Sequence, residues 1–315
     1  MTRLGLLLKS YAGDHAYAER LIASFREHNP SGLTLYCVVP ESDMNLFAPL
    51  AGGDVQVLSE QPLARHFTDK PIHGIRPGYI NQEIVKLAFW ELGLVDAYFC
   101  IDSDAVIIRD VQQSDFIAPD GWPYTVLVED RDLHAEPDYY KQYWQSRERA
   151  MRLIADTVGL ADPVLRTCHG HQVMSSTVLE SFTKEFLSPR GWDYLDALTV
   201  APYEFSWYNF WLQKSKVIPI HQREPFVKVF HNEPQYLEHV LSGTTLGDLA
   251  RAYVAVVINS NFSRDRNVVS LSESKTLALA PMLSYREYAS LGAAKARSTL
   301  KGLIKRRNQG PRDSA

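Results

Sequence analysis

The first hundred residues alternate between short apolar runs and a segment with helical spacing. Apolar runs at residues 4–8, 33–39 and 55–58 predict buried strands. Between the first two, apolar residues recur every three or four positions and predict a helix over residues 15–28, which Asn29-Pro30-Ser31-Gly32 ends. This strand–helix–strand order predicts a parallel sheet with crossover helices.

The same order then repeats and leads to a pair of aspartates. Residues 77–92 predict a helix with Ile80 and Ile84 on one face, and Gly93 ends it. A strand at 98–101 follows, and Asp102-Ser103-Asp104 comes directly after it. The two aspartates should therefore lie at the carboxyl end of a central strand, where open α/β sheets bind their ligands.

The rest of the chain continues the alternation without internal repeats. Strands are predicted at 124–128, 172–178, 217–220, 226–230 and 254–258, and helices at 136–158 and 179–186. We predict an α/β fold with a mostly parallel sheet flanked by helices. It forms one domain over residues 1–285, followed by a basic, helical tail over residues 286–315.

Composition narrows the class of protein without naming a function. The 315 residues are 45% hydrophobic and 22% charged, which is typical of a soluble globular protein. Cys37, Cys100 and Cys168 are widely spaced, and they suit a reducing compartment better than a disulfide framework or a zinc site. The N-terminus predicts a first strand and not a signal peptide, and no apolar run is long enough for a membrane span. We expect a cytoplasmic protein.

The charge is distributed unevenly along the chain. Residues 286–313 carry eight basic and two acidic residues, so this segment contributes +6 to a total of −4 and leaves −10 for the remainder. An acidic body argues against a nucleic-acid partner. Apolar residues among the basic ones suit an interfacial helix on anionic lipid at the inner face of a membrane, and they suit a solvated terminus equally well.

The pair Asp102 and Asp104 carries the clearest chemical signal. A carboxylate in an apolar run needs a partner or a metal, and no basic residue adjoins Asp102 or Asp104 in the sequence. On an extended chain, side chains two positions apart project from the same face, about 6–7 Å apart. A divalent cation completed by water and phosphate oxygens fits such a pair. The alternative is a strand-end pair that caps the next turn.

These features together resemble the GT-A-fold glycosyltransferases, whose Asp-x-Asp motif binds a divalent metal and a nucleotide-sugar diphosphate. The resemblance rests on Lys9-Ser10-Tyr11-Ala12-Gly13-Asp14 after the first strand, on the helix bearing Gln82 and Lys86, and on the strand that delivers Asp102 and Asp104. It covers residues 4–262. It is closest to a poorly characterised bacterial branch, and more distant to glycogenin-like and lipopolysaccharide galactosyltransferase-like enzymes. The chain lacks the His-x-x-Gly-x-x-Lys-Pro-Trp ending of the glycogenin-like branch.

The resemblance implies a metal site for Mn²⁺ or Mg²⁺. Asp102 would face the ribose and the metal, and Asp104 would be the direct metal ligand. A later histidine completes the metal shell in related enzymes, and His231 is the best match in this sequence. His221 competes with it, and His169 or His171 are further alternatives.

The resemblance also implies a donor site and an acceptor site. Ser10, Tyr11 and Asp14 would hold the nucleotide base and ribose, and Lys86 would approach the nucleotide or its diphosphate. Glu204 is the candidate base that an inverting mechanism needs, whereas a retaining enzyme needs none. The partners would be a nucleotide-sugar donor and a glycan or lipid-linked acceptor, as in the biosynthesis of a cell-surface polysaccharide.

Each of these residues also has a purely structural interpretation. Lys86 could lie on a solvated helix face, Glu204 could cap a helix, and His231 could be a satisfied sheet histidine. Tyr11 could fill the core, and Asp14 could be the N-cap of the first helix.

The sequence thus predicts a metal-dependent glycosyltransferase of the hexosyltransferase type. The first alternative is a haloacid dehalogenase-like, Mg²⁺-dependent phosphatase, with Asp102 as the phosphorylated nucleophile and Asp104 as the acid/base. That motif normally ends the first strand of its fold, whereas several strands and helices precede it here. The second alternative is a catalytically inactive binding protein that keeps the GT-A-like fold.

Overall fold

The computed structural model describes residues 2–127, 137–163, 170–231, 235–236, 239 and 243–259. The chain divides into two compact units. The first comprises residues 1–228 and 253–257, and the second comprises residues 229–252 and 258–315. The predicted basic tail, residues 286–315, lies outside the described residues. Within the described part, no helix is both long enough and apolar enough to cross a membrane.

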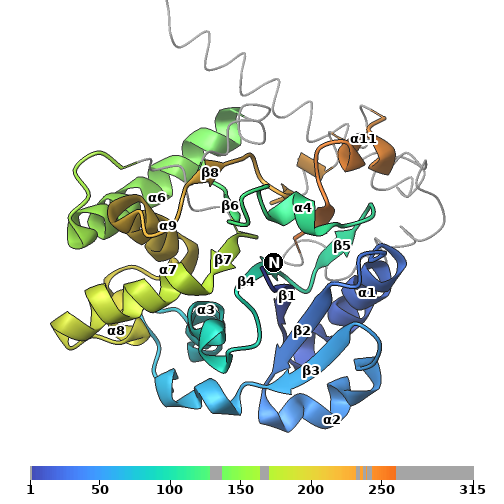
Figure 1. Ribbon diagram of the computed structural model, residues 1–315, viewed down its shortest axis with the longest axis horizontal. Coiled ribbons are helices and arrows are strands. Elements are labelled where there is room, and N and C mark those ends of the chain that lie inside the picture. Colours follow the sequence, from blue (N-terminus) through green and yellow to red (C-terminus); the bar gives the residue numbers. More distant parts are fainter. Residues whose placement is uncertain are drawn as a thin grey trace, which may run out of the picture. The chain divides into compact units, whose positions relative to one another are not determined.

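A five-stranded sheet forms the centre of the first unit (Figure 1). Its strand order is β3-β2-β1-β4-β7, and the first four strands are parallel while β7 runs antiparallel to β4. The strands are β1 (Leu4–Lys9), β2 (Thr34–Val39), β3 (Val55–Ser59), β4 (Ala97–Ile101) and β7 (Val173–Ser175). The prediction of an α/β fold with a mostly parallel sheet is confirmed.

Helices connect these strands and cover the sheet. They are α1 (His15–Glu27), α2 (Met44–Phe47), α3 (Pro77–Ala88), α4 (Gln113–Phe116), α6 (Pro137–Val158), α7 (Ser176–Ser181), α8 (Tyr194–Val200) and α9 (Glu204–Ser215). Short helical turns add η1 (Ala12–Asp14), η2 (Glu41–Asp43), η3 (Ala48–Leu50), η4 (Gln61–His66), η5 (Phe89–Leu92), η6 (Phe182–Leu187) and η7 (Ser188–Arg190). As predicted, Gly93 ends the α3–η5 segment, where it adopts a left-handed backbone with φ of 66°.

Both faces of the sheet are buried, which explains why its strands read as continuous apolar runs. Leu7 and Tyr98 point to one face and join the main core cluster with side chains from α3 and from α6 to α9. Leu6 and Phe99 are also fully buried and lie outside that cluster. On this second side Phe99 packs against Phe116, with ring centroids 4.7 Å apart. The sheet is therefore the middle layer of the first unit.

Smaller strands lie outside the central sheet. β5 (Ala105–Ile107) pairs antiparallel with residues 255–257 of β10 (Ala255–Ile258), and β6 (Tyr124–Thr125) pairs parallel with β8 (His221–Gln222). β9 (Val227–Phe230) is the remaining strand. The boundary between the two units falls within both β9 and β10.

The second unit is small in its described part. It contains α11 (Leu246–Ala250), whose N-terminus has a capping box formed by Thr245 and Asp248. The ring of Phe230 packs edge-on against Tyr236 and His239. The backbone N–H of His231 donates a 2.8 Å hydrogen bond to Oε1 of Gln235.

Three predicted strands differ from the structure. Residues 172–178 divide into β7 and the start of α7, because the chain turns into a helix at Ser176. Residues 217–220 form no strand: Pro219 cannot donate a backbone hydrogen bond, and the side chain of Val217 is 37% exposed. The predicted strand at 124–128 is reduced to the two residues of β6, and its last position lies outside the described residues.

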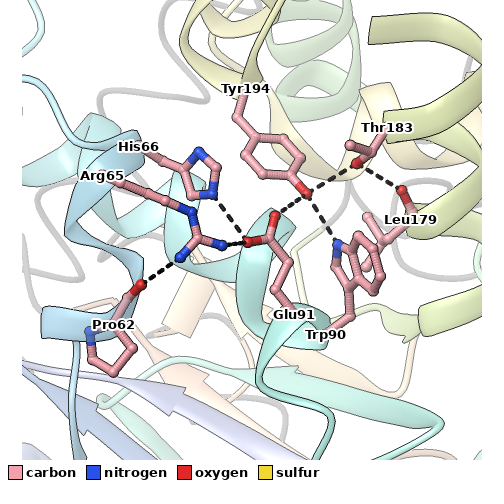
Figure 2. A network of polar contacts seen from close by, with 8 residues as sticks. All are labelled: Pro62, Arg65, His66, Trp90, Glu91, Leu179, Thr183 and Tyr194. Atoms are coloured by element: carbon pink, nitrogen blue, oxygen red, sulfur yellow. Dashed lines mark hydrogen bonds and ion pairs between the residues drawn. The ribbon is translucent and has the colours of Figure 1, made fainter. Parts of the chain in front are cut away.

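A polar network joins the turn before β4 to the helices that follow β7 (Figure 2). Glu91 is at its centre: Oε2 accepts from Arg65 and lies 3.0 Å from Nε2 of His66, while Oε1 accepts from the Tyr194 hydroxyl at 2.9 Å. Nε1 of Trp90 donates to the Tyr194 hydroxyl at 3.0 Å, and the Thr183 hydroxyl lies 3.0 Å from it. Both oxygens of Glu91 thus have protein partners, and the network fixes η4 and η5 against α8 and η6.

Candidate functional site

Asp102 and Asp104 lie in a tight turn at the end of β4. The backbone N–H of Ala105 donates a 3.1 Å hydrogen bond to the carbonyl oxygen of Asp102, so Ser103 and Asp104 are the two central residues of a four-residue turn. The prediction that the two aspartates project from one face of an extended chain is therefore wrong. Their position at the carboxyl end of a central strand is confirmed.

Lys86 reaches this turn from α3. Its Nζ lies 3.2 Å from Oδ1 of Asp102 and 3.1 Å from Oε1 of Glu204, the first residue of α9. The side chains of Lys86 and Glu204 are 7% and 10% exposed, whereas that of Asp102 is 39% exposed. A single buried ammonium thus links two carboxylates that lie far apart in the sequence.

The electrostatics of the cluster keep Lys86 charged. Burial alone lowers the pKa of this amine, but the Asp102 and Glu204 carboxylates outweigh burial and hold its pKa well above the ordinary value. The Nζ atom also lies 4.9 Å from the centre of the Phe205 ring, a favourable contact for a cation. Lys86 is therefore no solvated surface lysine.

Glu83, one helical turn before Lys86, is a site residue that the sequence analysis missed. Its side chain is almost fully buried, and Oε2 has no hydrogen-bond partner among the described residues. Burial, and then the charge of Glu204, raise the pKa of Glu83 to about 9, although Lys86 and Arg147 oppose the shift. Glu83 is therefore a neutral acid at pH 7. Its signal was an acidic residue on the helix face that Ile80 and Ile84 bury.

His171 lies on the other side of Asp102. Its Nε2 is 3.8 Å from Oδ2 of Asp102, and the residue is 3% exposed. Its backbone is left-handed, with φ of 65°. The side-chain amide of the next residue, Gln172, makes two hydrogen bonds with the backbone of Val126. Its Oε1 accepts from the Val126 N–H at 3.2 Å, and its Nε2 donates to the Val126 carbonyl oxygen at 3.1 Å. The sequence analysis had named His171 only as one alternative metal ligand.

The loop after β1 adjoins the aspartate turn. The Ser103 hydroxyl donates a 3.4 Å hydrogen bond to Oδ2 of Asp14. Asp14 occupies the N-cap position of α1, but its side chain makes no capping hydrogen bond, so the cap interpretation does not explain it. Ser10 is 1% exposed, and its Oγ has no hydrogen-bond partner among the described residues. A buried polar atom of this kind at a strand end is suited to a polar ligand.

Tyr11 is half-buried and packs on its own loop. A Cβ atom on Gly13 would lie 2.5 Å from Cε2 of the Tyr11 ring, so this ring position requires glycine at 13. The guanidinium of Arg76, at the start of α3, lies 6.0 Å from the centre of the same ring. Tyr11 therefore lies at the surface of the loop and not in the core.

The histidines named in the sequence analysis differ in placement. Nε2 of His221 lies 2.8 Å from Oδ2 of Asp120, so the imidazole of His221 already has a carboxylate partner. His231 belongs to the second unit, and its role as a ligand stays a prediction. His169 lies outside the described residues. In the part of the chain that the structure describes, no three His, Cys, Asp or Glu side chains form a metal-binding group.

Of Asp102, Lys86 and Glu204, Asp102 has the most exposed side chain. Asp102 is exposed enough to reach a ligand, one of its oxygens is oriented by Lys86, and an imidazole nitrogen lies near the other. Carboxylate oxygen and imidazole nitrogen are ligands that Mn²⁺ accepts, and the remaining positions could be filled by phosphate oxygens and water.

Residues 3–237 match DUF6492, a family of unknown function. The chain belongs to this family. Comparison of the DUF6492 chain with curated protein sequences finds no match.

Two solved structures are similar in fold. The apo form of mouse xyloside xylosyltransferase 1 matches 82% of this chain and 98% of its own, with 12% identity and a TM-score of 0.44. The apo structure of the bifunctional glycosyltransferase WbbM matches 81% of this chain and 45% of its own, with 12% identity and a TM-score of 0.46. At this identity neither likeness tells what the DUF6492 chain binds or transfers.

Proposed function

We propose that this protein is a metal-dependent glycosyltransferase of the GT-A type, which moves a sugar from a nucleotide-sugar donor to a hydroxyl acceptor. The observation that supports the proposal most is the cluster at the end of β4, in which buried Lys86 links Asp102 to Glu204 beside the loop that holds Asp14. Ligands of open α/β sheets bind at this edge.

The charges of the cluster argue for a cation. In the ion pairs that the structure describes, the carboxylates of Asp102 and Glu204 share the ammonium of Lys86, and Asp14 contacts Ser103 beside them. Unit charges 4 Å apart interact by about 4 kcal/mol at an effective dielectric near 20. A diphosphate would be repelled from such a site unless a divalent cation compensates the carboxylates.

In this proposal Asp102 and Asp104 hold Mn²⁺ or Mg²⁺, which when bound would stabilise the negative charge of the departing diphosphate. Lys86 keeps Asp102 in place through its 3.2 Å contact. Ser10, Tyr11 and Asp14 bind the nucleotide base and ribose. His231 remains the candidate ligand from the second unit.

Glu204 is the candidate base. Its Oε1 is 3.1 Å from Nζ of Lys86, which orients the carboxylate, and its second oxygen is the candidate to accept a proton from an acceptor hydroxyl. Base catalysis typically contributes about 10²–10⁴-fold. Glu204→Gln should therefore lower kcat by that order and leave donor binding unchanged in an inverting enzyme. A product with retained configuration at the anomeric carbon would contradict the role of Glu204 as a base.

The test is calorimetric titration of the full chain with nucleoside diphosphates and nucleotide sugars, with and without Mn²⁺. We expect metal-dependent binding of one nucleotide, which Asp104→Asn and Asp102→Asn abolish without a loss of folded structure. Hydrolysis of a generic phosphate ester without nucleotide binding would instead indicate the phosphatase that uses Asp102 as nucleophile. Binding with no turnover of any donor would indicate an inactive binding protein.

The acceptor and the location belong to the same proposal. The composition supports a cytoplasmic protein, and the basic segment after Tyr285 supports peripheral contact with the inner face of a membrane that carries a lipid-linked or glycan acceptor. Truncation after Tyr285 should abolish binding to anionic liposomes and leave donor hydrolysis unchanged. Undiminished liposome binding by the truncated chain would contradict this role.

A further inference from the structure

One face of α3 carries Tyr79, Glu83 and Lys86 at helical spacing. Side chains three or four positions apart in a helix lie on the same face, so these three follow one another along α3. Glu83 and Lys86 are buried, whereas Tyr79, in the first turn, is 47% exposed. The face therefore leads from the protein surface to the ion pair between Lys86 and Glu204.

Tyr79 is unusual among the exposed apolar side chains. In the described part of the chain, the large exposed ones are Leu46, Tyr79, Leu153 and Val217. Tyr79 is the aromatic member of this set, and burial, followed by the carboxyl groups of Glu204 and Glu83, raises the pKa of its hydroxyl. The hydroxyl thus lies close to the cluster, while part of the ring remains at the surface. A single exposed ring is no site by itself.

Glu83 supplies a second, independent observation. It is 2% exposed, and its Oε2 has no hydrogen-bond partner among the described residues. A buried polar atom of this kind is unfavourable unless water or a ligand pairs with it. Because Glu83 follows Tyr79 by one helical turn, a group that pairs with Oε2 would approach along the Tyr79 side of the helix.

Three helices meet around these residues, because α9 packs against both α3 and α6. From α6, the guanidinium of Arg147 lies 5.2 Å from the centre of the Tyr203 ring, and its charge also acts on Glu83. Tyr203 is half-buried and directly precedes Glu204 at the start of α9. The cluster is therefore accompanied by two aromatic rings, those of Tyr79 and Tyr203.

The ring of Tyr79 stands on a rigid element. The side-chain amide of Asn81 accepts from the N–H of Thr68 and donates to its carbonyl oxygen, each at 3.0 Å, which fixes the loop before α3. A Cβ atom on Gly78 would meet no atom within 4 Å, so the surface next to Tyr79 is open. A fixed ring beside an open surface is suited to bind a flat molecular face.

We propose that Tyr79 and Glu83 form a saccharide-binding subsite, in which a pyranose stacks on the Tyr79 ring and one of its hydroxyl groups pairs with Glu83. The inference rests on the proposed function and deepens it, because it identifies the acceptor as a carbohydrate that binds beside Glu204, the candidate base.

The chemistry of the two side chains favours a carbohydrate. A pyranose has a face of C–H bonds, which packs on an aromatic ring, and hydroxyl groups, which donate to a carboxyl oxygen. A lipid chain would cover the ring but leave Oε2 of Glu83 without a partner. A phosphate has no flat apolar face for the ring. A nucleobase also stacks on aromatic rings, and the experiment distinguishes it.

The experiment is saturation-transfer difference NMR of the full chain, without metal or nucleotide. The probes are the methyl glycosides of glucose, galactose, mannose and N-acetylglucosamine, with uridine and adenosine as nucleosides. Tyr79→Leu is the test variant, because leucine covers the same surface without a ring. Tyr17→Leu is the matched control: Tyr17 is also the third residue of its helix, and its ring lies 4.7 Å from the guanidinium of Arg20.

We expect saturation of the C–H protons on one face of at least one glycoside. Its binding should weaken roughly two- to tenfold in Tyr79→Leu and stay unchanged in Tyr17→Leu. No saturation of any glycoside, or equal saturation in Tyr79→Leu, would overturn the proposal. Loss of a nucleoside signal in place of a glycoside signal would assign the ring to a base and overturn it as well.

Two further measurements support the test. Glu83→Leu should weaken glycoside binding, because leucine pairs with no hydroxyl group, and unchanged binding would overturn the role of Glu83. If Tyr79→Leu does not fold by circular dichroism, the unaltered chain with ¹³C-labelled tyrosine rings replaces it, and Tyr79→Phe assigns the resonance. The glycoside should then shift the Tyr79 resonance and leave that of Tyr17 in place; an unshifted Tyr79 resonance would overturn the proposal.

The glycoside assay separates this inference from the function on which it rests, because it contains neither donor nor metal. Turnover of a nucleotide sugar without Tyr79-dependent glycoside binding would overturn the subsite and keep the transferase. Tyr79-dependent glycoside binding without turnover of any nucleotide sugar would keep the subsite and contradict the transferase. In an active transferase, Tyr79→Leu should raise the KM for the acceptor and leave donor hydrolysis unchanged.

Discussion

Glu91 lies in the helical turn before β4 and Asp102 directly follows the strand, and both carboxylates have cationic neighbours. Glu91 is enclosed: Arg65, His66 and Tyr194 occupy its two oxygens, and Trp90 and Thr183 complete the network (Figure 2). Around Asp102 the balance differs, because one lysine is shared between two carboxylates and neighbouring Glu83 has an oxygen with no partner among the described residues.

The difference distinguishes a structural cluster from a functional one. A polar network in which each member is satisfied stabilises a unique packing and leaves little for a ligand to improve. A cluster with surplus negative charge is stabilised by whatever cation it binds. By this criterion we expect a ligand to bind at the carboxyl end of β4, and we expect the segment before β4 to act as scaffold.

The largest effect that tests this distinction is expected for Lys86→Met. It would leave Asp102 and Glu204 without their shared ammonium, and removal of one partner of a buried ion pair costs about 3–5 kcal/mol. The partial exposure of Asp102 places the expected loss of unfolding free energy at the lower end. Urea unfolding measures it. The double variant Lys86→Met/Glu204→Gln should recover part of the loss, and no recovery would mean that the lysine stabilises by packing alone.

The next effect is a pH dependence due to Glu83. Its pKa is raised from near 4.5 in the unfolded chain to about 9 in the folded protein, so between these values the folded state holds a proton that the unfolded state has lost. Glu83 therefore costs no stability at pH 4, and its cost grows as the pH rises towards 9.

Glu83→Gln should remove this pH dependence. Thermal unfolding at pH 5 and pH 8 should show the variant gaining stability relative to the unaltered protein as the pH rises. If the stability difference between Glu83→Gln and the unaltered protein is the same at pH 5 and pH 8, Glu83 is ionised in the folded state. The cluster around Asp102 would then carry one more negative charge.

The smallest effect is expected in the enclosed network. Tyr194→Phe removes the hydroxyl that donates to Glu91 and accepts from Trp90, which should cost about 1–3 kcal/mol of unfolding free energy. Mn²⁺ and nucleotide binding should not change. Arg65→Gln serves as control: the Arg65 side chain is 61% exposed, so its ion pair with the enclosed Glu91 should contribute at most about 1 kcal/mol. Altered nucleotide affinity in Tyr194→Phe would show that the network is part of the binding site.

The sequence predicted the scaffold well because the relevant signals are local. The strands β1, β2 and β4 and the helix α1 lie within a residue of their predicted bounds, and the predicted helix over 77–92 divides into α3 and η5 before it ends at Gly93. The direction of β7 was not predictable, because a short apolar run fits a parallel and an antiparallel neighbour equally well. The prediction of an extended chain at Asp102 failed for a similar reason, because two aspartates within an apolar run are compatible with an extended strand and with a turn.

The site was predictable in part. Asp102 stands out as a carboxylate between apolar runs, but Lys86, which contacts it, also contacts Glu204 at a sequence separation of 118 positions, which no local pattern encodes. The contact of Ser103 with Asp14 spans 89 positions. The left-handed backbone of His171 has no marker in the sequence, because histidine is not the residue that normally signals it. Glu83 could have been found as an acid on an otherwise apolar helix face.

The position of β4 inside the sheet has a consequence for how the protein opens. β4 is hydrogen-bonded to β1 on one edge and to β7 on the other, so local unfolding of β4 must break two ladders at once. The loop at Ser10 to Asp14 belongs to no strand ladder and is held by single hydrogen bonds, such as the one that the backbone N–H of Ala12 donates to Asp43 at 2.6 Å. Segments with few such bonds open at the lowest free energy. The loop after β1 should therefore open at a lower free energy than β4.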